Sequence, residues 1–184
     1  MGCDYGKICK ENGIYTRIVS CCLNVWYDEV SKSCEQEYLK LADMGNDGFN
    51  HYLEHLKLKN KIQDGDGIVI EILTRIYQKL VHLENLIQHH EETFLPLKQE
   101  GIICALGHGV VCLENADFKR GQKYYMRFEL PVFPQRYIGI FVEAFDKEIL
   151  KITQMHQRDI QDFDTYIANK EIENLRIQHK RKDI

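Results

Sequence analysis

A heptad pattern of apolar residues is the clearest feature of this chain. It lies between Gly67 and Leu95, a stretch with no proline and no glycine after its first residue. The apolar steps alternate between four and three, which keeps one seam of a helix facing a partner helix. The seam residues are Val69, Leu73, Ile76, Leu80, Leu83, Ile87 and, after a break at His90, Phe94. We therefore predict a helix over residues 67–95, roughly 40 Å long at 1.5 Å per residue.

This helix is predicted to mediate self-association. Leu73, Leu80, Ile87 and Phe94 take the a positions, and some d positions are β-branched, a combination that favours three or four strands over a parallel dimer. Further apolar residues beside the seam widen it, as expected for a helix that packs on earlier helices of its own chain. An oligomer between dimer and tetramer is the expectation, and an intramolecular bundle without an assembly role is the alternative.

Beyond Pro96, which ends the predicted helix, the apolar pattern changes to period two. Tyr124, Met126 and Phe128 would share one face of a strand, while Arg127 points the other way. Short segments of this kind, separated by turn residues, predict a small antiparallel barrel followed by a helix. The predicted strands cover residues 101–106, 109–114, 124–130, 137–145 and 148–155. The predicted final helix begins at Asp159 or Gln161 and turns Phe163, Ile167, Ile172 and Leu175 toward the barrel.

The segment before the heptad is predicted to be mainly helical. Residues 14–19 are rich in β-branched side chains and fit either a short strand or the entry to a helix. A helical pattern follows from Tyr27, and its apolar positions are Val30, Cys34, Tyr38 and Leu41. A turn cluster at residues 45–48 ends this helix, and a second helix follows before Asp66, a natural N-cap for the heptad helix.

The predicted fold class is therefore α+β, in three parts. Residues 1–66 form a helical N-terminal region, and residues 67–95 form the long heptad helix. Residues 96–184 form the small barrel with its C-terminal helix.

Composition and charge narrow the function classes. The chain has 184 residues, 44% of them hydrophobic, and a formal net charge of −4, so nothing global indicates a nucleic-acid partner. No segment approaches about 18 uninterrupted apolar residues, and the N-terminus lacks the apolar core of a signal peptide. We expect a cytoplasmic protein without membrane insertion. The sequence contains no phosphate loop, dinucleotide fingerprint or nucleophile elbow, so neither an enzyme nor a cofactor is expected.

The cysteines and histidines support an alternative. Seven cysteines are present, and their odd number and the absence of a signal peptide predict free thiols rather than disulfides. Five of them fall near the N-terminus: Cys3, Cys9, Cys21, Cys22 and Cys34. Possible metal ligands on the predicted helices are His51, His55, Glu84, His89, His90 and Glu91. The cysteine spacing does not match a zinc site, but a metal- or thiol-sensing helical module remains the alternative function.

The order of elements resembles a PilZ domain over about residues 95–178. The resemblance is clearest in the segment 104–109 and in Lys119-Arg120-Gly121, which is followed by Tyr125, Phe128 and Leu130. The helix before it is similar to the heptad-bearing helix of a divergent PilZ group that oligomerises. This resemblance implies a barrel closed by a C-terminal helix, and a setting in bacterial cyclic-dinucleotide signalling, type IV pili or motility.

The ligand motif of PilZ domains is degenerate in this chain. The family binds cyclic dimeric GMP through an Arg-x3-Arg segment just upstream of the barrel and an Asp-x-Ser-x-x-Gly turn. Here Cys104 and Leu106 stand in place of Asp and Ser, and only Gly109 is kept. Residues 88–92, taken as the upstream segment, contain no arginine and two glutamates, which would repel an anionic ligand, and the nearest upstream arginine is Arg75.

The degenerate motif and the heptad together define the expected function. We predict that the chain does not bind cyclic dimeric GMP in the family mode. We expect a regulatory or adaptor protein that acts through self-association and through contact with a signalling, pilus or motility protein.

Overall fold

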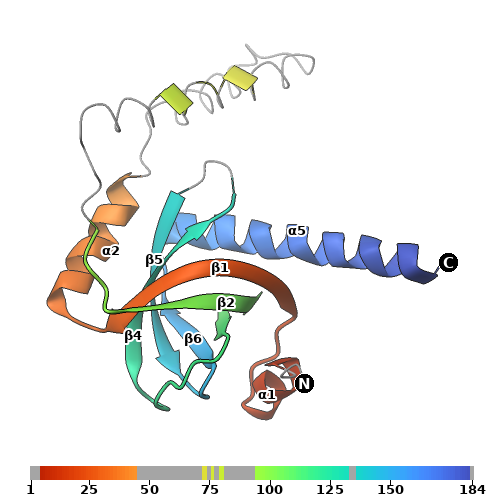
Figure 1. The fold of residues 1–184 in the computed structure, drawn as a ribbon, viewed down its shortest axis with the longest axis horizontal. Helices are drawn as coiled ribbons and strands as arrows, with labels where there is room; N and C mark the ends of the chain where they lie inside the picture. The colour runs from red at the N-terminus through yellow and green to blue at the C-terminus, as the bar shows by residue number, and fades with distance from the viewer. Residues whose placement is uncertain are drawn as a thin grey trace. The chain divides into compact units, whose positions relative to one another are not determined.

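The computed structural model describes residues 5–44, 72–73, 76, 79–80, 94–132 and 136–182. The chain divides into two compact units, one made of residues 1–42 and 96–184 and the other of residues 43–95. The first unit contains six strands and three helices in the part that the structure describes (Figure 1). The helices are α1 (Tyr5–Glu11), α2 (Lys32–Met44) and α5 (Gln157–Lys182). The strands are β1 (Ile18–Glu29), β2 (Gln99–Gly107), β3 (Val110–Leu113), β4 (Lys123–Leu130), β5 (Arg136–Ala144) and β6 (Ile149–Gln154).

The strands form a closed antiparallel barrel in the order β1-β2-β3-β6-β5-β4. The predicted α+β class and the antiparallel barrel are therefore confirmed. All five predicted strands are present as β2 to β6, within a few residues of their predicted ends. The interior is filled by alternate residues of the strands, among them Ile103, Val111, Phe128 and Ile140, which have no more than 1% of their surface exposed.

The first barrel strand lies in the N-terminal region, where the sequence predicted helices. The prediction of a helical region over residues 1–66 is wrong for Ile18–Glu29, which form β1. This strand pairs with β2 along residues 18–27 and with β4 along residues 25–29, so it bends from one neighbour to the other and closes the barrel. Its inward side chains include Val19, Leu23 and Val25, which pack in the barrel interior.

Helix α2 confirms the helical pattern predicted after Tyr27, although the helix begins at Lys32. Cys34, Tyr38 and Leu41 are buried as predicted, whereas Val30 precedes the helix and is 40% exposed. The buried face of α2 packs on the outside of the barrel. There the Tyr38 ring lies edge-on to Phe141, with ring centroids 5.1 Å apart.

A buried ion pair reinforces this contact between α2 and the barrel. Arg127 on β4 donates a hydrogen bond to Glu37 on α2, with 2.6 Å between Nη1 and Oε1. Both side chains are about 93% buried. The Arg127 guanidinium also lies 5.9 Å from the centre of the Trp26 ring on β1, within range of a cation–π contact. The ion pair thus holds α2 to β4, and the same arginine contacts the neighbouring strand β1.

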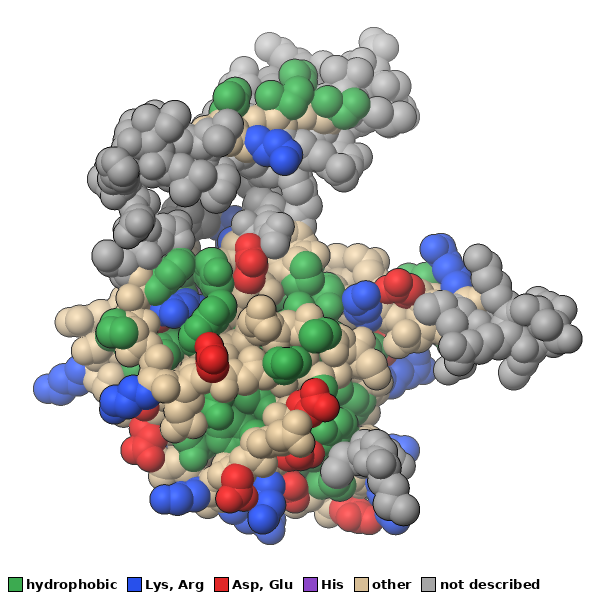
Figure 2. Space-filling model, in the orientation of Figure 1, with side chains coloured by type: hydrophobic (Ala, Val, Ile, Leu, Met, Phe, Trp, Pro, Cys, Tyr) green, Lys and Arg blue, Asp and Glu red, His purple; other side chains and the backbone are tan. Residues whose placement is uncertain are grey.

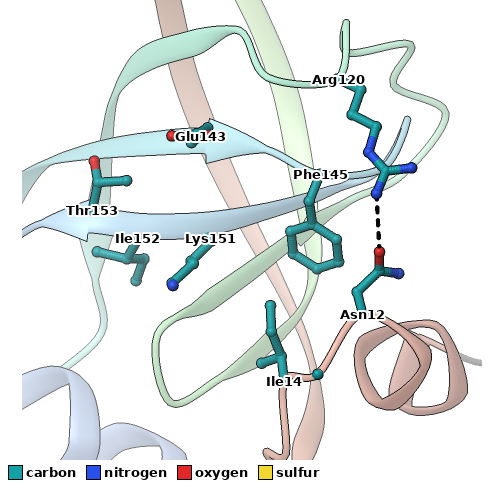
Figure 3. Close-up of a pocket in the computed structure, with 9 residues that line it drawn as sticks. Asn12, Ile14, Arg120, Glu143, Phe145, Lys151, Ile152 and Thr153 are labelled. Atoms are coloured by element: carbon teal, nitrogen blue, oxygen red, sulfur yellow. Dashed lines mark hydrogen bonds between the residues drawn. The ribbon is translucent and has the colours of Figure 1, made fainter.

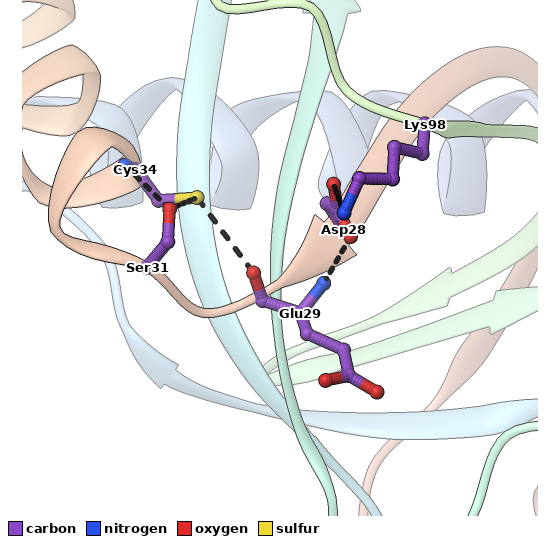
Figure 4. A network of polar contacts seen from close by, with 5 residues as sticks. All are labelled: Asp28, Glu29, Ser31, Cys34 and Lys98. Atoms are coloured by element: carbon purple, nitrogen blue, oxygen red, sulfur yellow. Dashed lines mark hydrogen bonds and ion pairs between the residues drawn. The ribbon is translucent and has the colours of Figure 1, made fainter.

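The second unit is inserted between two neighbouring barrel strands. Strands β1 and β2 are adjacent, yet residues 30–98 separate them in the sequence and contain α2 and the whole second unit. Lys98 reaches back to Asp28 at the end of β1 (3.6 Å), and the Ser31 and Cys34 side chains meet at the start of α2 (Figure 4). The predicted heptad helix therefore does not precede the barrel in sequence, because β1 comes before it.

Helix α5 covers one end of the barrel. Phe163, Tyr166 and Ile167 enter the barrel core, in agreement with the predicted roles of Phe163 and Ile167. Ile172 and Leu175 were also predicted to face the barrel, but they are 47% and 52% exposed. The reason is geometric, because α5 extends well beyond the barrel at its C-terminal end (Figure 1).

Candidate functional site

The segment predicted to carry a degenerate nucleotide motif forms the β2–β3 hairpin. Gly109 lies in the turn with φ of +77°, a left-handed conformation that favours glycine whatever the ligand. Leu106 is fully buried in the barrel interior. Cys104 is half-buried and lies in a second cluster, on the outer face of the sheet. The three motif positions are therefore occupied by a turn residue, a core residue and a covered thiol.

Helix α1 covers the outer face of the hairpin. Tyr5 and Cys9 on α1 pack with Cys104 and Cys112 in the second hydrophobic cluster. The Cys104 thiol lies 3.3 Å from the Tyr5 hydroxyl, which donates a hydrogen bond to Glu148 Oε2 at 3.1 Å. Burial is the largest cause that raises the pKa of both Tyr5 and Cys104 above their ordinary values. The face on which the motif lies is thus closed by the chain itself.

The thiols of Cys9, Cys21 and Cys112 are poorly suited to redox or metal chemistry. Burial raises the pKa of Cys9 and Cys112 above the ordinary value, and it raises the pKa of Cys21 to about 12. Such thiols remain protonated near neutral pH, and the thiolate is the reactive and metal-binding form. Within the ranges that the structure describes, no group of three or more histidine, cysteine or acidic side chains could hold a metal. Of the residues that the alternative function would use, seven lie outside these ranges: Cys3, His51, His55, Glu84, His89, His90 and Glu91.

The segment just upstream of the barrel differs from the one that the sequence indicated. Because β1 begins at Ile18, that segment is residues 12–17 rather than 88–92, and it contains one arginine, Arg17. A Cβ atom added at Gly107 would lie 2.8 Å from the carbonyl oxygen of Arg17, so the hairpin and this segment are in close contact. The Arg17 side chain pairs with Glu171 on α5 at 3.3 Å.

Acidic side chains of α5 line the same end of the barrel. Besides the pair formed by Glu171, Asp164 Oδ1 lies 2.7 Å from Nδ1 of His108 in the hairpin turn. The arginine and the histidine that could meet an anion here are therefore both engaged by carboxylates. Arg17 was missed because the sequence pattern placed the start of the barrel between Pro96 and Gly101, well after Ile18, where β1 begins.

The predicted oligomerisation residues belong to the second unit. Leu73, Ile76 and Leu80 are helical and have 56%, 50% and 58% of their surface exposed. Figure 2 shows hydrophobic side chains on this described part of the unit. Phe94 lies in an irregular segment before Pro96. Val69, Leu83 and Ile87 lie outside the described residues.

Comparisons of the chain with protein-family models, with curated proteins and with solved structures found no match. Among the described residues, no helix combines the length and the apolar character that crossing a membrane requires.

Proposed function

We propose that this chain is a regulatory or adaptor protein that acts through protein–protein contacts. It would combine a PilZ-like barrel that has lost its nucleotide site with an inserted helical unit that self-associates. The resemblance to the PilZ family suggests bacterial cyclic-dinucleotide, pilus or motility signalling as the setting, and a protein of such a system as the partner. This assignment to a setting is an analogy with the family and depends on no site residue.

The exposed heptad residues are the observation that favours self-association. Leu73, Ile76 and Leu80 follow the heptad steps of three and four and are each at least half exposed. An apolar helical stripe left in water is unfavourable, and burying it against the same stripe of a second copy removes that cost. A second copy is the natural occupant, because a heptad seam is complementary to itself.

Replacing Leu80 with Asp tests the assembly. We expect the native chain to be a dimer, trimer or tetramer by size-exclusion chromatography with light scattering. An unpaired carboxylate in the seam costs several kcal/mol, so the dissociation constant should rise at least about 100-fold. Lys79→Asp is the matched control, since it adds a carboxylate at the neighbouring exposed position. A native chain that is monomeric at all concentrations would contradict the proposal.

The loss of the nucleotide site gives a second prediction. Isothermal titration calorimetry of the full chain with cyclic dimeric GMP should show no heat of binding. The ligand concentrations should be those that saturate a PilZ domain carrying the complete motif. The reason is that Cys104 offers no carboxylate, Leu106 lies in the core, and Arg17 is one arginine already paired with Glu171. Micromolar or tighter binding would show that the motif is not needed here.

A further inference from the structure

A surface cavity lies where the loop before β1 meets the outer face of β5 and β6. Its volume is about 590 Å³, which is within the range of pockets that bind small molecules. Asn12 and Ile14 of the loop form one wall, and Phe145 and Lys151 line the strand side (Figure 3). Arg120, from the turn before β4, completes the lining at one end.

The position of Arg120 is fixed by neighbouring groups. Its Nη2 donates a hydrogen bond to Asn12 Oδ1 at 3.3 Å. The Asn12 side-chain amide donates in turn to the Ile8 carbonyl oxygen of α1 at 2.9 Å. The turn itself is attached to β5, because the Gly121 backbone N–H donates to the Ala144 carbonyl oxygen at 2.7 Å. One hydrogen bond therefore orients the exposed guanidinium at the cavity, and the barrel holds the turn that carries it.

Two cations and an aromatic ring face the same cavity. Among the described residues, neither Arg120 nor Lys151 forms an ion pair with a carboxylate, although Glu143 is opposite Lys151 in the β5–β6 register and also lines the cavity. In the view of Figure 3, the Phe145 ring lies between the Arg120–Asn12 pair and Lys151. Positive charge on both sides of an apolar ring suits an anion that carries a ring of its own.

We propose that this cavity binds a small aromatic phosphate monoester. The arginine fork of Arg120 matches the oxygens of phosphate, and Lys151, on the other side of Phe145, adds a second positive charge to the cavity. A flat ring would pack on Phe145 in an offset or edge-to-face arrangement. Glu143 would accept a hydrogen bond from an N–H or O–H group of the ligand. Cys104, Leu106 and Gly109 do not line this cavity, so the proposal is independent of the degenerate motif and of the assembly.

Titration with phenyl phosphate, followed by NMR of the backbone amides, tests the proposal on the full chain. We expect saturable shifts at Gly13 and Phe145, with a dissociation constant on the order of millimolar, as expected for a ligand of this size. Arg120→Gln and Lys151→Gln should each weaken binding about tenfold, the effect of losing one hydrogen bond to a charged group. Lys147→Gln is the matched control, because Lys147 is an exposed lysine of the β5–β6 turn that does not line the cavity.

Two comparison ligands separate the contribution of the phosphate charge from that of the aromatic ring. Inorganic phosphate supplies the charge without the ring, and phenol supplies the ring without the charge, so both should bind at least several-fold more weakly than phenyl phosphate. Equal binding of inorganic phosphate would contradict the aromatic part of the proposal. The absence of shifts at Gly13 and Phe145, or equal binding by all three lysine and arginine variants, would overturn it altogether. Thermal unfolding of each variant verifies that a lost signal does not come from a lost fold.

Discussion

Replacing Glu37 with Ala should lower the free energy of unfolding by about 3–5 kcal/mol, the loss typical of breaking a buried ion pair. The change leaves the Arg127 guanidinium buried beside Trp26 without the carboxylate that now lies 2.6 Å away. Burial in the barrel–α2 contact prevents water from replacing that carboxylate at low cost. Urea unfolding followed by circular dichroism measures the effect.

Three further variants define the origin of this loss. Asp117→Ala breaks an ion pair with Lys147 whose side chains are 83% and 77% exposed, and it should change the stability by no more than about 0.5 kcal/mol. Glu37→Gln keeps a hydrogen-bond acceptor for Arg127 and should cost less than Glu37→Ala. The double variant Glu37→Met with Arg127→Leu should recover much of the loss, since apolar residues of similar volume often replace buried ion pairs without penalty. A loss below about 1 kcal/mol for Glu37→Ala would mean that water enters the contact.

Strands β2 to β6 could be predicted because each combines a period-two pattern with turn residues at its ends. Tyr124, Met126 and Phe128 alternate with Lys123, Tyr125 and Arg127 in the sequence, and the structure places the first set in the barrel interior. Arg127 was expected to point the other way, and on that outer face Tyr125 and Arg127 are buried under α2. Local periodicity identifies the inner face of a strand, whereas it does not show what a distant helix covers on the outer face.

Strand β1 escaped prediction although its side chains alternate: Val19, Cys21, Leu23 and Val25 pack inward, and Ser20, Cys22 and Asn24 are exposed. The alternation continues across the register shift with β2 between Ser20 and Leu23. The helical pattern of α2, which begins at Lys32 shortly after the strand ends, was extended back into the strand. The inserted unit then separates β1 from β2, and the pairing of the two strands is a contact that no local pattern indicates.

The environment of the candidate site is equally non-local. The contact between Tyr5 and Cys104 joins residues 99 positions apart, and Arg17 and Glu171 are 154 positions apart. From the sequence, Cys104 could be singled out only through the resemblance to a PilZ domain, which predicts an acidic residue at this position. The covering of Cys104 by α1 could not be predicted. Helix α1 has only seven residues and one buried cysteine, so its sequence resembles that of many exposed turns. The structure thus shows that the outer face of the β2–β3 hairpin around Cys104 is covered by α1.

A shortened chain of residues 96–184, the barrel domain that the sequence predicted, should show no cooperative unfolding transition. Removing β1 takes away the partner of both β2 and β4, so the barrel opens along two edges and its interior loses Val19 and Val25. Conversely, replacing residues 45–95 of the full chain with a Gly/Ser linker of about ten residues, whose ends lie about 17 Å apart on average, should preserve a cooperative transition. The reason is that β1, α2 and the barrel belong to one compact unit. Thermal unfolding followed by circular dichroism distinguishes the two chains, and cooperative unfolding of residues 96–184 alone would show that β1 is an accessory strand rather than part of the minimal barrel.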